Sequence, residues 1–119
     1  MTVSATGYLF LAASITSTTT ATSVGGYVVP ASTRTQIIAV TIANMATSNA
    51  VGYVDTSIYS NTASASYGVG GRKTAVYPGG SFVVVGAEKH VMATGGAFQV
   101  TSYSTIQLDV VMTAVELST

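Results

Sequence analysis

The sequence predicts an all-β protein: a single antiparallel β-sandwich, of the jelly-roll or immunoglobulin-like kind, with about eight strands and an extended N-terminal segment. The 119 residues are 48% hydrophobic, and Thr, Ser and Gly make up much of the remainder, a composition that favours strands over helices. Short apolar segments alternate with a period of two, turn signals separate them every 8 to 12 residues or so, and no segment has a convincing helical period. A chain of this length builds one core and one domain.

The first 33 residues carry no charged side chain, and Arg34 is the first charged residue. Residues 8–15 (YLFLAASI) are predicted to form a strand. A signal peptide is the second interpretation, although no Lys or Arg precedes the run and it is too short to span a bilayer. The Thr/Ser tract at 16–23 fits either a solvated strand edge or an extended arm. We therefore describe 1–24 as an N-terminal strand or arm and 25–119 as the β-sandwich.

Two strands are predicted from alternation in the first half of the chain. Pro30 ends the segment before them, because proline cannot donate to a central ladder. Residues 34–44 form the clearest strand, and 44–49 its turn; residues 51–60 form the next. The expected faces are Ile38, Val40 and Ile42 against Ile37, Ala39, Thr41 and Ala43 in the first strand, and Val54, Thr56 and Ile58 against Tyr53, Asp55, Ser57 and Tyr59 in the second.

Glycine pairs divide the second half of the chain. Gly70-Gly71 is a two-residue hairpin signal, which would place Arg72 and Lys73 at a hairpin tip. The residues 78–80 (PGG) give a second turn. Segments 81–87, 88–94 and 97–103 are then expected to form a meander of three strands, and 105–117 a long closing strand.

Glu88, Lys89 and His90 stand side by side between two apolar runs in a chain with few charges. A zinc site needs three or four protein ligands, but the chain has one histidine and no cysteine to supply them. There is no Gly-x-Ser-x-Gly elbow either. The trio is therefore predicted to be the solvated tip of a turn or part of an intersubunit salt bridge. We expect no enzyme, metal or cofactor.

The seven tyrosines are candidates for recognition, because an aromatic platform on a sheet face can stack on sugar rings. Tyr53 and Tyr59 could share a face of their strand, about 20 Å apart, but tyrosines at a subunit interface or flanking the core explain them more simply. The candidate interface residues are Tyr53, Tyr59, Arg72, Lys73, Glu88, Lys89 and His90.

Charged residues make up only 7% of the chain and the formal net charge is zero. Low net charge promotes association, so we predict a homo-oligomer, with a trimer as the first guess. Four scattered cations supply little of the basic patch that nucleic acid needs. We expect neither a nucleic-acid nor a membrane partner.

The order of several segments resembles small virion structural proteins of tailed bacteriophages, including phages of cyanobacteria. The segments are VVPAS at 28–32, IIAVTIAN at 37–44, YPGGSFVVVGAEKHVMATGGAFQVTS at 77–102 and LDVVMTAVEL at 108–117. The resemblance implies a β-sandwich, location in the virion and no enzymatic activity, but it carries no functional residue across. The uncharged first 33 residues contain no matching motif, and the charge content is low for such a protein.

From this resemblance we expect a capsid decoration (cement) protein that contacts the major capsid protein or other virion proteins. A tail, connector or fibre-base component is the alternative within the same class. A carbohydrate-binding adhesion module is the alternative from another class.

Overall fold

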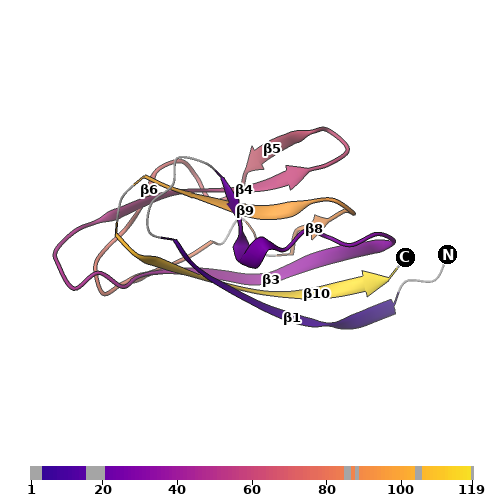
Figure 1. The fold of residues 1–119 in the computed structure, drawn as a ribbon, viewed down its shortest axis with the longest axis horizontal. Coiled ribbons are helices and arrows are strands. Elements are labelled where there is room, and N and C mark those ends of the chain that lie inside the picture. Colours follow the sequence, from indigo (N-terminus) through magenta and orange to yellow (C-terminus); the bar gives the residue numbers. More distant parts are fainter. Residues whose placement is uncertain (1–3, 16–20, 85–86, 88, 104–105, 119) are drawn as a thin grey trace.

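The computed structural model describes residues 4–15, 21–84, 87, 89–103 and 106–118. In this part of the chain ten strands and one 3-10 turn form two antiparallel sheets that pack face to face (Figure 1). The all-β sandwich predicted from the sequence is confirmed. The elements are β1 (Ser4–Ile15), β2 (Thr22–Ser23), η1 (Val24–Gly26), β3 (Thr33–Asn44), β4 (Gly52–Ser60), β5 (Ala65–Gly68), β6 (Thr74–Val76), β7 (Ser81–Val83), β8 (Val91–Met92), β9 (Ala97–Ser102) and β10 (Leu108–Ser118).

The first sheet has the order β1-β10-β3, with β7 and β8 both paired to β3. β7 pairs with residues 41–43 of β3 and β8 with residues 35–36, so the two short strands occupy successive stretches of the same edge. The second sheet is built in the same way. Its order is β2-β9-β4, and β5 and β6 pair with successive stretches of β4.

Each sheet is therefore four strand positions wide, and the pairing is nested. β1 pairs with β10, β2 with β9, β3 with β7 and β8, and β4 with β5 and β6. A chain folded on itself in this way and then rolled into two sheets is a jelly roll. Of the two kinds of sandwich predicted, the topology selects this one, and the eight strand positions match the predicted number.

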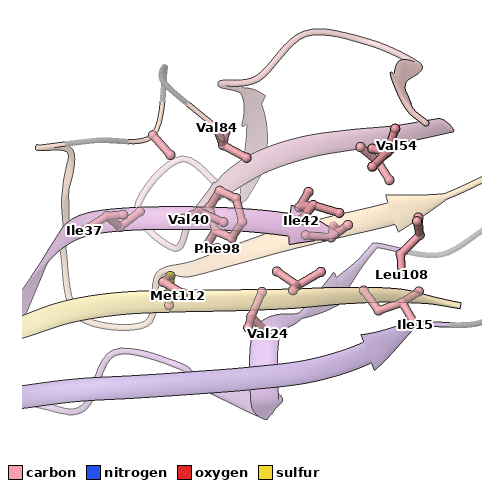
Figure 2. Packing of buried hydrophobic residues seen from close by; sticks show 14 of the residues in the cluster. Ile15, Val24, Ile37, Val40, Ile42, Val54, Val84, Phe98, Leu108 and Met112 are labelled. Carbon is pink, nitrogen blue, oxygen red and sulfur yellow. The ribbon is translucent and has the colours of Figure 1, made fainter. Parts of the chain in front are cut away.

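The core lies between the two sheets and is formed by every second residue of the long strands. In β10 the buried residues are Leu108, Val110, Met112 and Ala114. Figure 2 shows Val40 of the first sheet and Phe98 of the second converging at the centre. Val24, from η1, is buried in the same core cluster. Burial of this apolar surface is the main stabilising term for the domain.

The N-terminal segment is part of the sandwich wherever the structure describes it. β1 pairs with β10 along its whole length, from Ser4 opposite Ser118 to Ile15 opposite Leu108. Thr22 and Ser23 pair with β9. Residues 16–20 of the Thr/Ser tract lie outside the described residues. Neither described piece before residue 24 is an arm that extends away from the domain.

One predicted face is wrong because β3 contains a bulge. Thr113 lies opposite Ala39 but Ala114 lies opposite Ile37, so Ile38 is an extra residue without a partner in β10. An extra residue reverses the alternation on one side of a bulge. As a result Ile37 is buried with Val40 and Ile42, whereas Ile38 points outward and is 42% exposed. The predicted faces of residues 51–60 agree with the burial of Val54 and Thr56.

The hairpin predicted at Gly70-Gly71 is also wrong. The strands on either side of the glycines, β5 and β6, both pair with β4 and continue in the same direction, so the glycines interrupt one edge strand. Gly70 lies against the core: a Cβ there would be 2.0 Å from Thr56 Oγ1 and 2.9 Å from Val84 Cγ1. Arg72 and Lys73 consequently lie beside β4 and not at a hairpin tip.

The three-stranded meander predicted for 81–103 is also wrong, because here too two successive strands pair with one edge of a longer strand and not with each other. β7 and β8 lie on the same edge of β3, and β9 lies in the other sheet. Two described residues between β7 and β8 also bond to β3: the Val84 N–H donates to Val40 O and the Lys89 N–H donates to Ile37 O. The turn at 78–80 is confirmed: the Gly80 N–H donates to Tyr77 O, and Gly79 has the positive φ of 74° that such a turn requires.

Candidate functional site

The outward face of the first sheet is apolar and lacks a partner in the described chain. Side chains that alternate with the core residues point to this face from all of its strands. We call it the apolar face; it consists of Tyr8, Phe10, Ala12, Ile38, Ala39, Thr41, Val83, Val91, Val111, Thr113 and Val115, and the amide side chain of Gln36 lies within it between Val91 and Val115. Tyr8 is 80% exposed and Phe10 72% exposed. The interior residues Leu9 and Leu11 alternate with them.

One charged residue lies at each end of the apolar face. Asp109 neighbours Ser14 and Ala43 at one end, and Arg34 neighbours Leu117 at the other. The Asp109 carboxylate accepts hydrogen bonds from Ser14 Oγ at 2.7 Å and Gln107 Nε2 at 3.0 Å. The Gln107 bond, followed by the Ser14 bond, lowers the pKa of Asp109, which keeps the carboxylate charged. Along the strands, the face is thus an uncharged surface between an anion and a cation, and Lys89 is exposed beside its β3 edge.

The outward face of the second sheet has a different chemistry. We call it the tyrosine face; it consists of Tyr53, Asp55, Ser57, Tyr59, Arg72, Lys73, Gln99, Thr101 and Tyr103. Hydroxyl, amide and charged groups replace the aliphatic side chains of the apolar face. The two surfaces lie on opposite sides of the sandwich, so the molecule has one apolar and one polar side.

Asp55 organises the centre of the tyrosine face. Its Oδ2 accepts a hydrogen bond from the Tyr103 hydroxyl, and its Oδ1 accepts one from the Lys73 N–H at 2.6 Å. The Lys73 ammonium lies 5.0 Å from the centre of the Tyr103 ring, within cation–π range. The hydrogen bond to Asp55, helped by burial and by the Asp55 charge, raises the pKa of Tyr103, whereas Arg72 opposes the shift.

An open depression of about 550 Å³ lies beside this cluster. Asp55, Ser57, Arg72 and Thr101 contribute polar side chains to its lining, and Gly68 and Gly71 leave room for it. Its volume is within the range of small-molecule sites, although it is wide open to solvent. The arrangement can hold a polar ligand against donors and acceptors.

The structure separates the predicted interface residues into two groups. Tyr53, Tyr59, Arg72 and Lys73 lie on the second sheet, and Arg72 and Lys73 flank the Asp55 cluster. Lys89 and His90 are exposed on the connection between β7 and β8, at the edge of the first sheet. Glu88 lies outside the described residues. The sequence therefore placed Asp55 on the same face as Tyr53 and Tyr59 but did not connect this face with Arg72, Lys73 and Tyr103.

Asp109 and Glu116 lie on opposite sides of β10. Asp109 is outward, whereas Glu116 accepts a hydrogen bond from the Tyr27 hydroxyl at 2.8 Å. Thr35 Oγ1 lies 2.7 Å from the same hydroxyl. Among the described residues no group of three or more His, Cys, Asp and Glu side chains is placed to hold a metal ion. No helix in the described part of the chain is long and apolar enough to cross a membrane.

Tyr8 and Phe10 were missed as interface residues. Residues 8–15 were recognised as an apolar strand, but a strand with apolar residues on both faces gives no indication of which face is buried. The signal that could have identified them is the alternation of two aromatic residues, Tyr8 and Phe10, with the two leucines Leu9 and Leu11.

The protein is thus a jelly-roll sandwich with two unlike outer surfaces: the apolar face on the first sheet and the polar tyrosine face on the second. The chain matches no protein-family model, and no curated protein matches it in sequence.

Proposed function

We propose that this protein is a non-enzymatic structural subunit of a tailed-phage particle, and that it acts as a capsid decoration protein. One observation carries the proposal: the apolar face. A decoration protein lies across the joints between capsid subunits and strengthens the shell by binding alone. The major capsid protein is the partner that this role requires.

The apolar face supports this proposal because folding does not account for it. Tyr8 and Phe10 are largely exposed, and neither belongs to the core cluster. Contiguous exposed apolar surface larger than a few hundred Å² marks an interaction site in soluble proteins. Covering such a surface with another protein removes it from water and yields about 25 cal/mol per Å² before the costs of association.

The jelly-roll topology is compatible with the proposal but does not carry it. Jelly rolls occur in viral capsid domains and also in lectins and cupins, so the fold alone leaves the function open. The particle is proposed from the resemblance to tailed-phage virion proteins. The capsid surface is proposed from the small size of the chain and from its single extended apolar face.

The test is to delete the coding sequence from the phage and challenge purified particles with heat and osmotic shock. We expect particles without the protein to release DNA at a lower temperature. The Tyr8→Ser protein, supplied in trans, should restore resistance poorly because it lacks the most exposed side chain of the apolar face. Tyr67→Ser is the matched control: Tyr67 is also exposed, but it lies on β5 in the other sheet. Equal resistance with and without the protein would refute the decoration role.

A tail, connector or fibre-base component is the alternative within this class. Stoichiometry distinguishes it from a decoration protein, because connectors and tails contain few copies per particle whereas head decorations approach the number of capsid subunits.

The depression on the tyrosine face favours carbohydrate binding as a second candidate function. A carboxylate, a guanidinium and two hydroxyl side chains line it, with the Tyr103 ring beside them. These groups bind sugar hydroxyls by hydrogen bonding and sugar rings by stacking. The test is saturation-transfer NMR of the full chain with glucose, galactose, mannose and N-acetylglucosamine. We expect the signal to be lost in Asp55→Ala and retained in Asp109→Ala, which removes a carboxylate from the other face; no transfer to any sugar would refute this candidate.

A further inference from the structure

We infer that the apolar face binds the apolar face of a second copy of this chain, across a two-fold axis that makes the strands of the two copies antiparallel. The inference rests on the proposed function for the assignment of this face to protein contact and goes beyond it: in the free protein the partner is a second copy, which the capsid protein must displace to bind the same face. Three features of the face support this arrangement: the charges at its ends, its surface relief and its size.

The charges make the face complementary to itself. Asp109 and Leu117 are eight residues apart on β10, and Arg34 is the neighbour of Leu117, so the anion and the cation are about 27 Å apart along the strands. A two-fold axis across the strands at mid-face brings the Arg34 end of one copy over the Asp109 end of the other. A parallel arrangement would instead bring the Arg34 ends of the two copies together and the Asp109 ends together. Like charges at those positions are unfavourable.

The axis must cross β10 midway between positions 109 and 117, which is at Thr113. Thr113 lies opposite Phe10 of β1 on one side and Ala39 of β3 on the other. In this arrangement Phe10 faces Phe10 of the second copy, as aromatic pairs across interfaces often do.

The relief of β1 is complementary about the same axis. Tyr8 lies two residues to one side of Phe10, and Ala12 lies two residues to the other. Antiparallel stacking therefore sets the bulky Tyr8 of each copy over the small Ala12 of the other. One operation satisfies both the charges and the shape of the face.

The size of the face is sufficient for a weak dimer. Four strand positions about 4.8 Å apart and about 27 Å of strand length give about 500 Å² per copy. Two copies bury about 1,000 Å² in total, which is at the lower limit for a specific interface. The expected species is a dimer that forms in the micromolar range, not the trimer guessed from the sequence.

The experiment is sedimentation equilibrium of the purified full chain, without any particle, between about 10 μM and 1 mM. We expect a monomer–dimer equilibrium. Phe10→Ser should weaken it by about tenfold or more, because a central aromatic side chain is a typical hot spot. Phe10 is exposed in the single chain, so its replacement should leave the melting temperature at high dilution unchanged.

A charge exchange tests the orientation of the two copies. Arg34→Glu and Asp109→Lys should each weaken the dimer, and the double variant should restore most of the affinity because the pair is reversed and not removed. Arg72→Glu is the matched control, since it makes the same change of charge on the other face. Failure of the double variant to recover would overturn the antiparallel arrangement.

A chain that stays monomeric at 1 mM would overturn the self-association. The proposed function would survive that result, because a capsid protein could cover the same face. Sedimentation of the purified chain tests the self-association, and the heat and osmotic challenge of particles tests the decoration role, so the two proposals can fail independently.

Discussion

Replacing Gly70 by Ala tests how the interruption between β5 and β6 packs against the core. The alanine Cβ would lie 2.0 Å from Thr56 Oγ1 and 2.9 Å from Val84 Cγ1. Both residues are almost fully buried, at 1% and 0% exposure, so neither can move away into solvent. Unstrained carbon contacts are about 3.5 to 4.0 Å, so one or both elements must shift.

Overpacking of this kind costs about 1 to 3 kcal/mol. For a domain of this size that is a decrease in melting temperature of about 4 to 12 °C. The loss is to be measured by thermal unfolding followed by circular dichroism. Because no backbone strain is involved at Gly70, whose φ is not positive, the destabilising part of the effect would come from the contact.

Gly68→Ala is the control in the same segment. A Cβ at Gly68 would approach only Thr56 O, at 4.0 Å, which is an ordinary contact. We expect its melting temperature to change little. If Gly70→Ala melted at the same temperature as Gly68→Ala, residues 69–73 would not be packed against the core and the reasoning would be refuted.

Three other predictions concern the interior. Thr56 Oγ1 is buried without a hydrogen-bond partner among the described residues, so Thr56→Val should leave stability unchanged or raise it by about 1 kcal/mol, and a clear loss in a melting experiment would contradict this. Phe98→Ala should destabilise by about 3 to 5 kcal/mol in urea unfolding because it empties the centre of the core, and a loss below about 1 kcal/mol would refute that packing. Burial, opposed by the Thr35 hydrogen bond and reinforced by Glu116, raises the pKa of Tyr27 to about 12 in the folded protein, above its ordinary value of 10.0. The folded protein favours the neutral phenol of Tyr27, so the contribution of Tyr27 to the free energy of unfolding is complete below pH 10 and is lost as the pH rises toward 12. The melting temperatures of the wild type and Tyr27→Phe should therefore converge between pH 10 and 12. Parallel curves over that window would refute the assignment.

The sequence was sufficient to predict the class of fold because the evidence for it is local. Alternation with a period of two identified the strands at 34–44, 51–60 and 105–117, an apolar run identified the strand at 8–15, and the residues 78–80 marked a turn. These patterns depend only on neighbouring residues. They do not depend on which strand pairs with which.

The failures arose where the outcome depends on distant residues. Gly70 and Gly71 are equally compatible with a tight turn and with a close approach to the core, and only the position of Thr56 and Val84 decides between them. Ile37 and Ile38 are both isoleucine, so the bulge that sends one inward and the other outward leaves no mark in the hydrophobic pattern. β7 and β8 pair with the same edge of β3 and β9 lies in the other sheet, which turn signals do not show.

The candidate surfaces were only half predictable for a similar reason. Tyr53, Arg72 and Lys73 could be named from residue type, but Asp55 and Tyr103 meet across two strands 48 residues apart in sequence. To predict the apolar face, one must know that both sides of β1 are apolar and that only one side of β1 packs against the second sheet.

The most direct test of the proposed function is the copy number of this chain in purified phage particles, by quantitative mass spectrometry against the major capsid protein. The account predicts a ratio approaching one, as expected for a protein that covers the joints of the head. A ratio of a few per cent would move the protein to the connector or tail, and its absence from particles would contradict the structural role altogether.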